Sequence, residues 1–566
     1  SYIGEVNIHN FDSDSTFIFD RNEFINNTFQ QTIGGGAGLI IRNIELSDST
    51  SPNETSSTIT LYNLELRDCQ FIGNHARQKG GGIQIGTTIA TSNVNLVIRN
   101  CQFENNSASN GGAIAIQIIG TVLIDNCTFT DNVATNYGTI FFKPDEFKDT
   151  LVNVSESISV VNCSFEHNKA LRGQAIYYEE GYSTSLYISD CGFLDNPNSG
   201  DLSSRLEISS TIFVLNTKDC IIENSIANCS ESPQRGVYVE GGEYEIRSFL
   251  FINNHLLPKK EAMGRDGAAI FIASASSHTL VSRCTFENCA GQNHNYAIES
   301  RNHNLTVEDN NFTFTNSYDD GGHSRGALYT SYSVLTFRNN FITNTNGNAL
   351  HYREFNQIEY LIMEDNIFDN CKSKAEFNSG NPMGRALTLR CQKPSNLDFT
   401  NNTIQNCPSS PQITTAISFS QSETETFIFN SNRFLNIETI GNELGGGSGL
   451  LIFIHNYGKL CIEMRNCVFD KSRTSNGDKN SDDDANHYGR GGAWQCGDYF
   501  DGSTLTTSIT DNTEPTFINC NFTNNIGNNG GSLSLYLHNP ILFQSCRFEN
   551  NTATMDGGAI HSPPDI

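Results

Sequence analysis

The sequence predicts an all-β protein, a parallel β-helix (solenoid) of about 17 coils across 566 residues. Three observations predict it. A phrase Phe-x-x-Asn returns from one end of the chain to the other, a second phrase Gly-Gly-Ala-Ile returns with it, and the segments between them alternate apolar and polar residues. "CQFENNSASNGGAIAI" at 101–116 and "CRFENNTATMDGGAI" at 546–560 show both phrases together. No stretch has sustained helical periodicity with capping residues.

We find seventeen copies of the first phrase, usually 25 to 36 residues apart. Ten copies have Phe followed by Asn three residues later; they begin at Phe24, Phe71, Phe103, Phe129, Phe165, Phe193, Phe251, Phe341, Phe522 and Phe548. Four have Cys in place of Asn: Ile226/Cys229, Phe286/Cys289, Phe368/Cys371 and Ile404/Cys407. Weaker copies stand at Phe312, Phe434 and Phe469. A regular period with no composition break favours one solenoid over a chain of small β domains or a β-sandwich.

One copy divides into strands and turns in order. In "NLVIRNCQF", residues 95–103, near alternation with β-branched and aromatic residues predicts strand, and Cys101 and Phe103 point to the same, inward face. Asn106 then closes the strand because Asn tolerates a left-handed backbone. Gly111-Gly112 permits a further turn, and "AIAIQI" begins the next strand. Two or three short strands and turns therefore make one coil.

Stacking explains why the phrase repeats. A single coil cannot bury its apolar face, whereas neighbouring coils bury it against each other. Equivalent residues of adjacent coils lie about 4.8 Å apart. Phe then lies on Phe, which contributes roughly 0.5–1.5 kcal/mol per pair beyond burial, and Asn lies on Asn as an amide ladder.

We expect residues 1–566 to form a single continuous β-helix, with loop insertions near 313–325 and 472–490. Both ends fall within repeats, so we expect a segment of a longer chain. The net charge is −27, and no basic stripe is interleaved with aromatic residues, which argues against nucleic acid as a partner. No apolar run reaches the 18 or so residues of a membrane helix, so no membrane span is expected in this segment.

The paired phrases Phe-x-x-Asn and Gly-Gly-Ala-Ile resemble the repeat of the chlamydial polymorphic membrane proteins. More broadly, the pattern is similar to right-handed β-helices of the pectin-lyase-like class, and the resemblance covers essentially the whole chain. It implies a right-handed β-helix. The chlamydial resemblance also implies a surface-exposed adhesin, and the wider class includes enzymes that cleave acidic polysaccharides.

Twelve Asn-x-Ser/Thr sequons predict N-linked glycans: Asn26, Asn53, Asn105, Asn126, Asn153, Asn162, Asn228, Asn304, Asn311, Asn401, Asn521 and Asn550. Chance accounts for some of them in a chain rich in Asn, Ser and Thr. Their positions argue for a role, because Asn126 and Asn162 directly precede an inward Cys, and Asn311 and Asn521 directly precede an inward Phe. Strand alternation then points these asparagines outward.

The 17 cysteines are expected mostly inside, nine of them two residues before the Phe. No close Cys/His set has the spacing of a metal site, so no metal is predicted. Some cysteines could form disulfides in an oxidising compartment. The best candidate pair is Cys371 and Cys407, which hold the same position on consecutive coils.

Two acidic insertions were weighed as catalytic or Ca²⁺-binding loops. The first holds Asp319, Asp320, His323 and Arg325. The second holds Asn476, Asp478, Asn480, Asp482, Asp483, Asp484, His487 and Arg490, and lacks the Gly and Glu of an EF-hand. Acidic insertions are more often solvated loops, so we predict no catalytic residues and no cofactor other than N-linked glycans, with Ca²⁺ as a minor alternative.

The sequence thus predicts an extracellular or cell-surface glycoprotein with a structural or adhesive role, a β-helical rod in a coat, appendage or filament. We expect self-association, or contact with neighbouring surface proteins or glycans. A polysaccharide lyase or hydrolase of the same fold is the first alternative, and a module that binds neutral glycans is the second.

Overall fold

The computed structural model describes residues 4–8, 16–30, 36–43, 60–87, 92–143, 156–179, 181–197, 210–229, 235–254, 269–273, 276–289, 296–301, 304–314, 326–331, 334–345, 348–353, 360–371, 386–391, 397–409, 415–419, 425–440, 450–454, 460–475, 494–496, 513–535 and 540–561. The chain forms two compact units, one of residues 1–264 and 268–280, the other of residues 265–267 and 281–566. Each unit is described by itself. The expectation of one uninterrupted stack stays a prediction.

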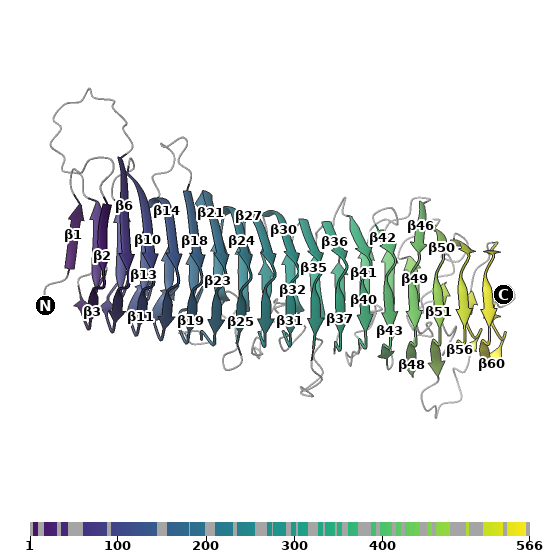
Figure 1. Ribbon diagram of the computed structural model, residues 1–566. Helices are drawn as coiled ribbons and strands as arrows, with labels where there is room; N and C mark the ends of the chain where they lie inside the picture. Colours follow the sequence, from purple (N-terminus) through teal and green to yellow (C-terminus); the bar gives the residue numbers. More distant parts are fainter. Residues whose placement is uncertain are drawn as a thin grey trace, which may run out of the picture. The chain divides into compact units, whose positions relative to one another are not determined.

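Every regular element in the described ranges is a β-strand (Figure 1). This part of the chain contains no helix of the length and apolarity needed to cross a membrane. The prediction of an all-β fold is confirmed.

The first unit stacks parallel strands into layers. The short strands that carry the Phe phrase are β3 (Glu23–Ile25), β7 (Gln70–Ile72), β11 (Gln102–Glu104), β15 (Thr128–Thr130), β19 (Ser164–Glu166), β22 (Gly192–Leu194), β25 (Ile226–Asn228) and β28 (Leu250–Ile252). Longer strands precede them: β2 (Thr16–Asp20), β6 (Thr60–Arg67), β10 (Ser92–Arg99), β14 (Ile119–Asp125), β18 (Glu156–Val161), β21 (Gly181–Ser189), β24 (Thr217–Glu223) and β27 (Gly242–Arg247). The third layer of this unit holds β1 (Gly4–Ile8), β5 (Leu39–Asn43), β9 (Ile83–Thr87), β13 (Ile114–Gln117), β17 (Ile140–Phe142), β20 (Ile176–Tyr178), β23 (Ser210–Leu215), β26 (Arg235–Glu240) and β29 (Ile270–Ile272). A narrow fourth layer holds β4 (Thr28–Phe29), β8 (His75–Ala76), β12 (Ser107–Asn110) and β16 (Val133–Tyr137).

The second unit repeats this plan. Its short strands are β31 (Thr285–Glu287), β34 (Asn311–Thr313), β37 (Phe341–Thr343), β40 (Ile367–Asp369), β43 (Thr403–Gln405), β47 (Arg433–Leu435), β51 (Val468–Asp470), β55 (Asn521–Thr523) and β59 (Arg547–Glu549). The preceding strands are β33 (Asn304–Glu308), β36 (Val334–Arg338), β39 (Leu361–Glu364), β42 (Leu397–Thr400), β46 (Glu425–Asn430), β50 (Leu460–Arg465), β54 (Thr513–Ile518) and β58 (Leu542–Gln544); β30 (Ser276–Ser282) spans the boundary between the units. The third layer holds β32 (Tyr296–Arg301), β35 (Gly326–Ser331), β38 (Leu350–Arg353), β41 (Leu387–Cys391), β45 (Thr415–Phe419), β49 (Leu450–Ile454), β53 (Trp494–Cys496), β57 (Leu533–Leu535) and β61 (Ile560–His561). The fourth holds β44 (Pro408–Ser409), β48 (Glu438–Ile440), β52 (Arg473–Ser475), β56 (Ile526–Asn529) and β60 (Thr552–Asp556).

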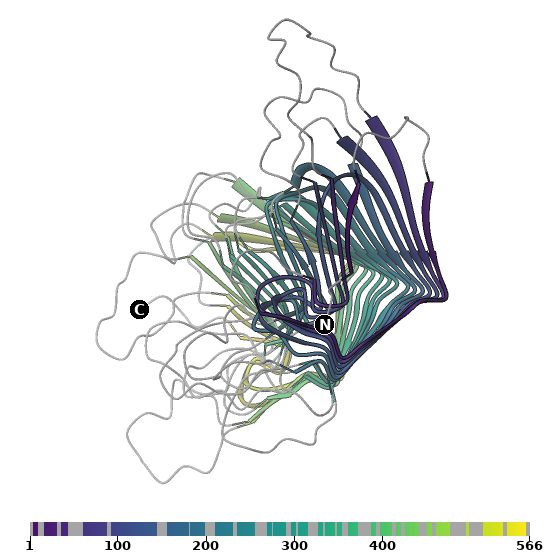
Figure 2. The same cartoon turned by 90° about the vertical axis from the view of Figure 1, so that its left-hand side faces the viewer.

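Each coil therefore pairs with the next in register, which is a parallel β-helix. Figure 2 looks along the stack, and the purple and blue strands of the first unit fall into layers that meet at narrow corners. The described short strands number eight in the first unit and nine in the second, in agreement with the predicted 17 coils.

The predicted aromatic ladder is confirmed. Phe103 pairs directly with Phe71 and Phe129, and all three side chains are fully buried. The ring of Phe103 lies 4.9 Å from each neighbour, centroid to centroid, and nearly parallel to it. The core of each unit is thus built of columns that run along the stack.

In two copies of the Phe phrase, the inward residue predicted from the sequence is wrong by one position. In β37 the inward residue is Ile342, which pairs between Phe312 and Phe368, whereas Phe341 is 37% exposed. Buried Asn340, two residues before Ile342, marks the true register, because it stands where Cys101 stands before Phe103. In β25 the inward residue is Ala227, and Ile226 is exposed. In both copies the sequence analysis predicts that the larger of two adjacent apolar residues points inward, whereas the smaller one does.

The amide ladder occupies two different columns. We call the position two residues before the inward Phe the leading slot, and the position three residues after it the trailing slot. In the first unit the trailing slot holds the predicted ladder of buried asparagines: Asn74, Asn106, Asn132, Asn168 and Asn196. In the second unit the leading slot holds another ladder, which the sequence analysis missed: Asn310, Asn340, Asn366, Asn402 and Asn432.

Both ladders satisfy the buried amides in the same way. Asn106 Nδ2 donates to Asn132 Oδ1 at 3.0 Å and to the Phe71 carbonyl at 2.7 Å. Asn366 Nδ2 donates to Asn402 Oδ1 at 2.9 Å and to the Phe337 carbonyl at 2.7 Å. Each Oδ1 accepts in turn from the amide of the preceding coil, so these buried polar groups are paired. The slot without Asn holds Cys or another small or apolar residue in most coils.

The corners between layers depend on left-handed residues. Asn100 and Asn105 have φ of 55° and 53°, and Asn is among the few side chains that adopt this conformation readily. Gly111 has φ of 66°, and a Cβ there would lie 2.2 Å from the Ile114 carbonyl oxygen. Only glycine fits that turn, as the Gly-Gly phrase predicted.

Candidate functional site

The predicted glycan acceptors lie mostly on the outside. Nine of those in the described ranges are exposed: Asn26, Asn105, Asn126, Asn162, Asn304, Asn311, Asn401, Asn521 and Asn550. Asn228 is half-buried, and Asn53 and Asn153 lie outside the described residues. All nine side chains are exposed, as N-glycosylation requires, and at several corner positions the acceptor nitrogen also donates to a neighbouring side chain, as Asn126 Nδ2 does to Asn100 Oδ1 at 2.9 Å.

Cys371 and Cys407 lie in the trailing slot of consecutive coils, as expected. Both thiols are free and fully buried, and the Cys371 amide donates to Cys407 Sγ at 3.3 Å. Burial raises the pKa of the Cys407 thiol well above its usual range. The disulfide between them stays a prediction.

Both acidic insertions that were weighed as catalytic or Ca²⁺ loops lie outside the described residues: Asp319, Asp320, His323 and Arg325 in the first, and residues 476–490 in the second. Within the described ranges no group of three or more His, Cys, Asp or Glu is arranged to hold a metal ion.

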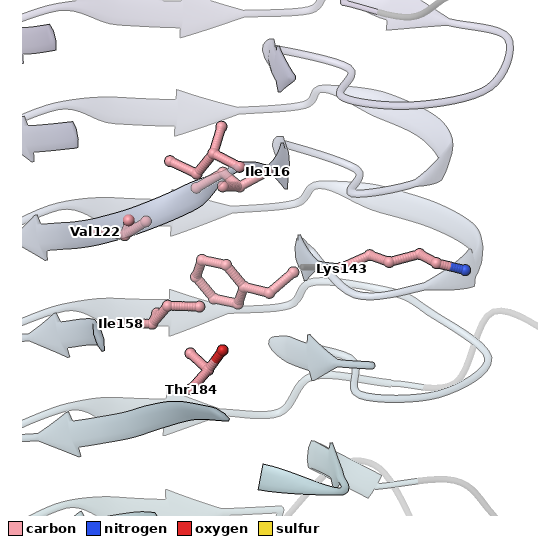
Figure 3. Close-up of a pocket in the computed structure, with 8 residues that line it drawn as sticks. Ile116, Val122, Lys143, Ile158 and Thr184 are labelled. Atoms are coloured by element: carbon pink, nitrogen blue, oxygen red, sulfur yellow. The ribbon is translucent and has the colours of Figure 1, made fainter. Parts of the chain in front are cut away.

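A small cavity lies at a corner of the first unit. Ile116, Val122 and Ile158 line it with apolar carbon, and Lys143 extends away from it (Figure 3). Its volume is about 10 Å³, which is space for at most one water molecule. It is a packing gap.

A larger concave feature lies on the outer face of the second unit. This polar groove of about 470 Å³ crosses β43, β47, β51, β55 and β59. It is lined by Gln405, Asn406, Arg433, Leu435, Asn436, Val468, Asp470, Lys471, Asn521, Thr523 and Arg547. Its volume is in the range of small-molecule and oligosaccharide sites.

Strand alternation produces the groove. In each short strand the middle residue points inward, so the residues on either side point outward and line up along the stack. Arg433, Val468, Asn521 and Arg547 are register partners in one outward column. The corner residues that follow the strands, with Lys471 among them, form the edge of the groove.

The groove is rich in hydrogen-bond donors. The exposed Arg433 and Lys471 make no ion pair within the described part of the chain. Arg547 contacts Glu549, and the Asp470 carboxylate accepts from Thr523 Oγ1 at 2.7 Å and from Asn524 Nδ2 at 2.8 Å. Half-buried Leu435 and Val468 add apolar surface between the charges. Such a surface suits a ligand that carries many hydroxyl, carbonyl or carboxylate oxygens.

The sequence analysis did not predict this groove. Its residues lie on five coils between positions 405 and 547, and only Asn521 had been singled out. The outward residues of these strands mix charged, polar and apolar side chains, so they give no uniform signal in the sequence.

The comparisons with known proteins agree with the fold. The family model described as "right handed beta helix region" matches residues 65–207, 203–359 and 268–457, which overlap to cover more than half of the chain. The model of the Chlamydia polymorphic membrane protein repeat matches residues 545–563. No curated protein matches the chain.

Two solved structures are distant neighbours. One is a mutant of the tailspike protein of E. coli bacteriophage HK620 in complex with a pentasaccharide, at 11% identity over 86% of this chain and 72% of that one, with a TM-score of 0.24. The other is a mutant of the PL6 family alginate lyase AlyGC, at 11% identity over 87% of this chain and 78% of that one, with a TM-score of 0.23. Scores this low carry no functional inference.

Proposed function

Because the chain belongs to the right-handed β-helix family, we propose that it is a scaffold of that fold working outside the cell, an extracellular structural or adhesive glycoprotein. The observation that carries the proposal is the placement of nine predicted glycan acceptors on exposed positions of both units. The match of residues 545–563 to the repeat of a membrane protein family from Chlamydia supports a surface location.

The buried side chains fit a scaffold. Phenylalanines, asparagines and cysteines form columns that hold one coil to the next, and they are occupied with one another. Recognition is then left to the outer faces, where the polar groove is the candidate contact site for a partner rich in oxygen acceptors, such as a glycan or a neighbouring surface protein.

The location can be tested by labelling cells that produce the protein. An antibody should stain intact cells as strongly as permeabilised ones, and peptide-N-glycosidase should lower the mass of the purified protein. Staining that appears only after permeabilisation, with no change of mass, would reject the proposal.

The groove also favours a second candidate function, cleavage of a polysaccharide. Asp470, Lys471 and Arg547 line the same groove, and a carboxylate together with basic side chains is the set of groups that acts on a glycosidic or uronate substrate. Release of reducing or unsaturated ends from pectin, alginate or a neutral glycan, lost in Lys471→Ala and Arg547→Ala, would establish an enzyme. Binding without product would support adhesion. Asn521→Gln serves as the parent here, because a glycan on Asn521 would itself fill the groove.

A further inference from the structure

Exposed apolar side chains follow two of the predicted glycan acceptors along the outer face of the second unit. Ten large apolar residues in the described ranges are exposed, and four of them fall in just two columns. These columns begin at Asn304 and Asn311, which belong to the same coil.

The first column runs from β34 to β40. Asn311 pairs with Phe341, and Phe341 pairs with Ile367, so the two apolar residues lie about 5 and 10 Å beyond the acceptor. Phe341 is 37% exposed and Ile367 is 39% exposed. On the other side Asn311 pairs with polar Thr285.

The second column has the same order. Asn304 pairs with Val334, which is 36% exposed. Tyr360 comes next, because the Leu335 amide donates to its carbonyl at 2.8 Å, and it is 52% exposed. Each acceptor is thus followed by an exposed apolar side chain on the next coil and by another on the coil after that.

Both acceptors are ready to carry a sugar. Asn304 and Asn311 are exposed on strands whose neighbouring residues point inward. Asn311 Oδ1 accepts from the hydroxyl of its sequon threonine, Thr313, at 3.3 Å, and its Nδ2 makes no hydrogen bond within the described residues. The glycan would attach at this nitrogen.

We propose that N-linked glycans on Asn304 and Asn311 lie along their columns and cover Val334, Tyr360, Phe341 and Ile367. This rests on the proposed function, since it requires a secreted glycoprotein. The C–H face and the acetamido methyl of N-acetylglucosamine are apolar, and they pack against an aromatic ring as an aliphatic group does. Uncovered, each column leaves two neighbouring apolar side chains exposed to water, where they favour association with other apolar surface.

The test compares single acceptor variants of protein secreted from a eukaryotic cell line. Asn311→Gln should bind an apolar fluorescent dye several-fold more strongly than the parent, and should associate at lower concentration. Asn550→Asp is the control, because it removes an exposed acceptor, keeps a side chain that tolerates the left-handed backbone, and has the polar Asn524 as its neighbour in the corner column. It should change neither readout.

A second pair of measurements guards against misfolding. Adding Phe341→Ser and Ile367→Thr to Asn311→Gln should return dye binding to the parental level, and trimming the glycans of folded parent with an endoglycosidase should raise it. Equal dye binding by the Asn311→Gln and Asn550→Asp proteins, or an unoccupied Asn311 beside other occupied acceptors, would overturn this inference alone. Absence of glycans at every acceptor would overturn the proposed function as well.

Discussion

At the scale of single residues, what a side chain does depends on which face of a three-residue strand it occupies. Phe103 and Phe341 belong to the same kind of strand, yet the first is fully buried and the second is 37% exposed. The difference is one position in register. The same residue type is therefore a core element in one coil and a surface element in another, and their substitutions should differ accordingly.

We expect Phe103→Ala to lower the free energy of unfolding of its unit by about 3–5 kcal/mol, because it opens a cavity and breaks two stacked ring pairs. Phe341→Ala is the control, and should change stability by less than about 1 kcal/mol. Urea unfolding followed by circular dichroism measures both. Similar losses for the two variants would contradict the register described above.

The sequence predicted the inward position of Phe103 because two signals agree there, the strand alternation and the returning phrase. It mispredicted β37 because Phe341 and Ile342 are both apolar, and the repeat was aligned on phenylalanine. Asn340 would have settled the register, but a buried asparagine in the leading slot was not considered. The groove could not be predicted at all, since its outline depends on how five separate coils align their outward residues.

At the scale of the element, one coil forms its hydrogen bonds with the coils on either side, through its strands and through one amide column. The first unit uses the trailing slot and the middle of the second unit uses the leading slot, but the bonds are the same. An amide in either corner joins the coil before it to the coil after it. Removing one member therefore leaves partners unsatisfied in both neighbours.

Replacing Asn366 by alanine should show this. The Asn340 backbone amide loses its acceptor, the Asn340 side chain loses one of its two acceptors, and the Phe337 carbonyl loses its side-chain donor, at about 1–3 kcal/mol for each buried group left unpaired. Asp365→Asn, at the adjacent exposed corner position, keeps the left-handed backbone and should cost less than about 0.5 kcal/mol. Hydrogen exchange should quicken in β37, β39 and β42 of Asn366→Ala only. Unchanged exchange there would show that the column is not a stabilising element.

At the scale of the whole molecule, the core contains many weakly acidic side chains, the thiols of cysteine and the phenols of tyrosine. Of the fifteen cysteines whose side chains the structure describes, all but the half-buried Cys546 are buried. Burial raises the pKa of the Cys220 thiol and of the Tyr177, Tyr238 and Tyr244 phenols. These groups stay protonated in the folded chain at a pH where an unfolded chain ionises.

The stability of the protein should therefore fall in alkali. Below the pKa that the group has in the unfolded chain, near 8.5 for Cys and 10 for Tyr, its burial contributes fully to the free energy of unfolding. That contribution is lost as the pH rises toward the higher pKa of the group in the folded chain. The loss is about 1.4 kcal/mol per pH unit for each group that ionises only on unfolding. Urea unfolding between pH 8 and pH 11 measures this loss. Cys220→Ala should make the fall of the unfolding free energy with pH less steep by the contribution of one group. A flat profile would contradict the buried state of these side chains.

The change of amide column has a consequence for how such a chain can be lengthened or shortened. A coil whose asparagine is in the trailing slot, such as that of Asn132, can be copied beside itself, and the new amide continues the column. The same coil inserted between those of Asn366 and Asn402 would interrupt their column with a thiol. Tandem duplication inside a run of like coils should therefore preserve the amide column, whereas a coil copied into the other kind of run interrupts it. In the second unit the trailing column returns after the leading one, at Asn525 and Asn551, so the two kinds of run can alternate along one chain.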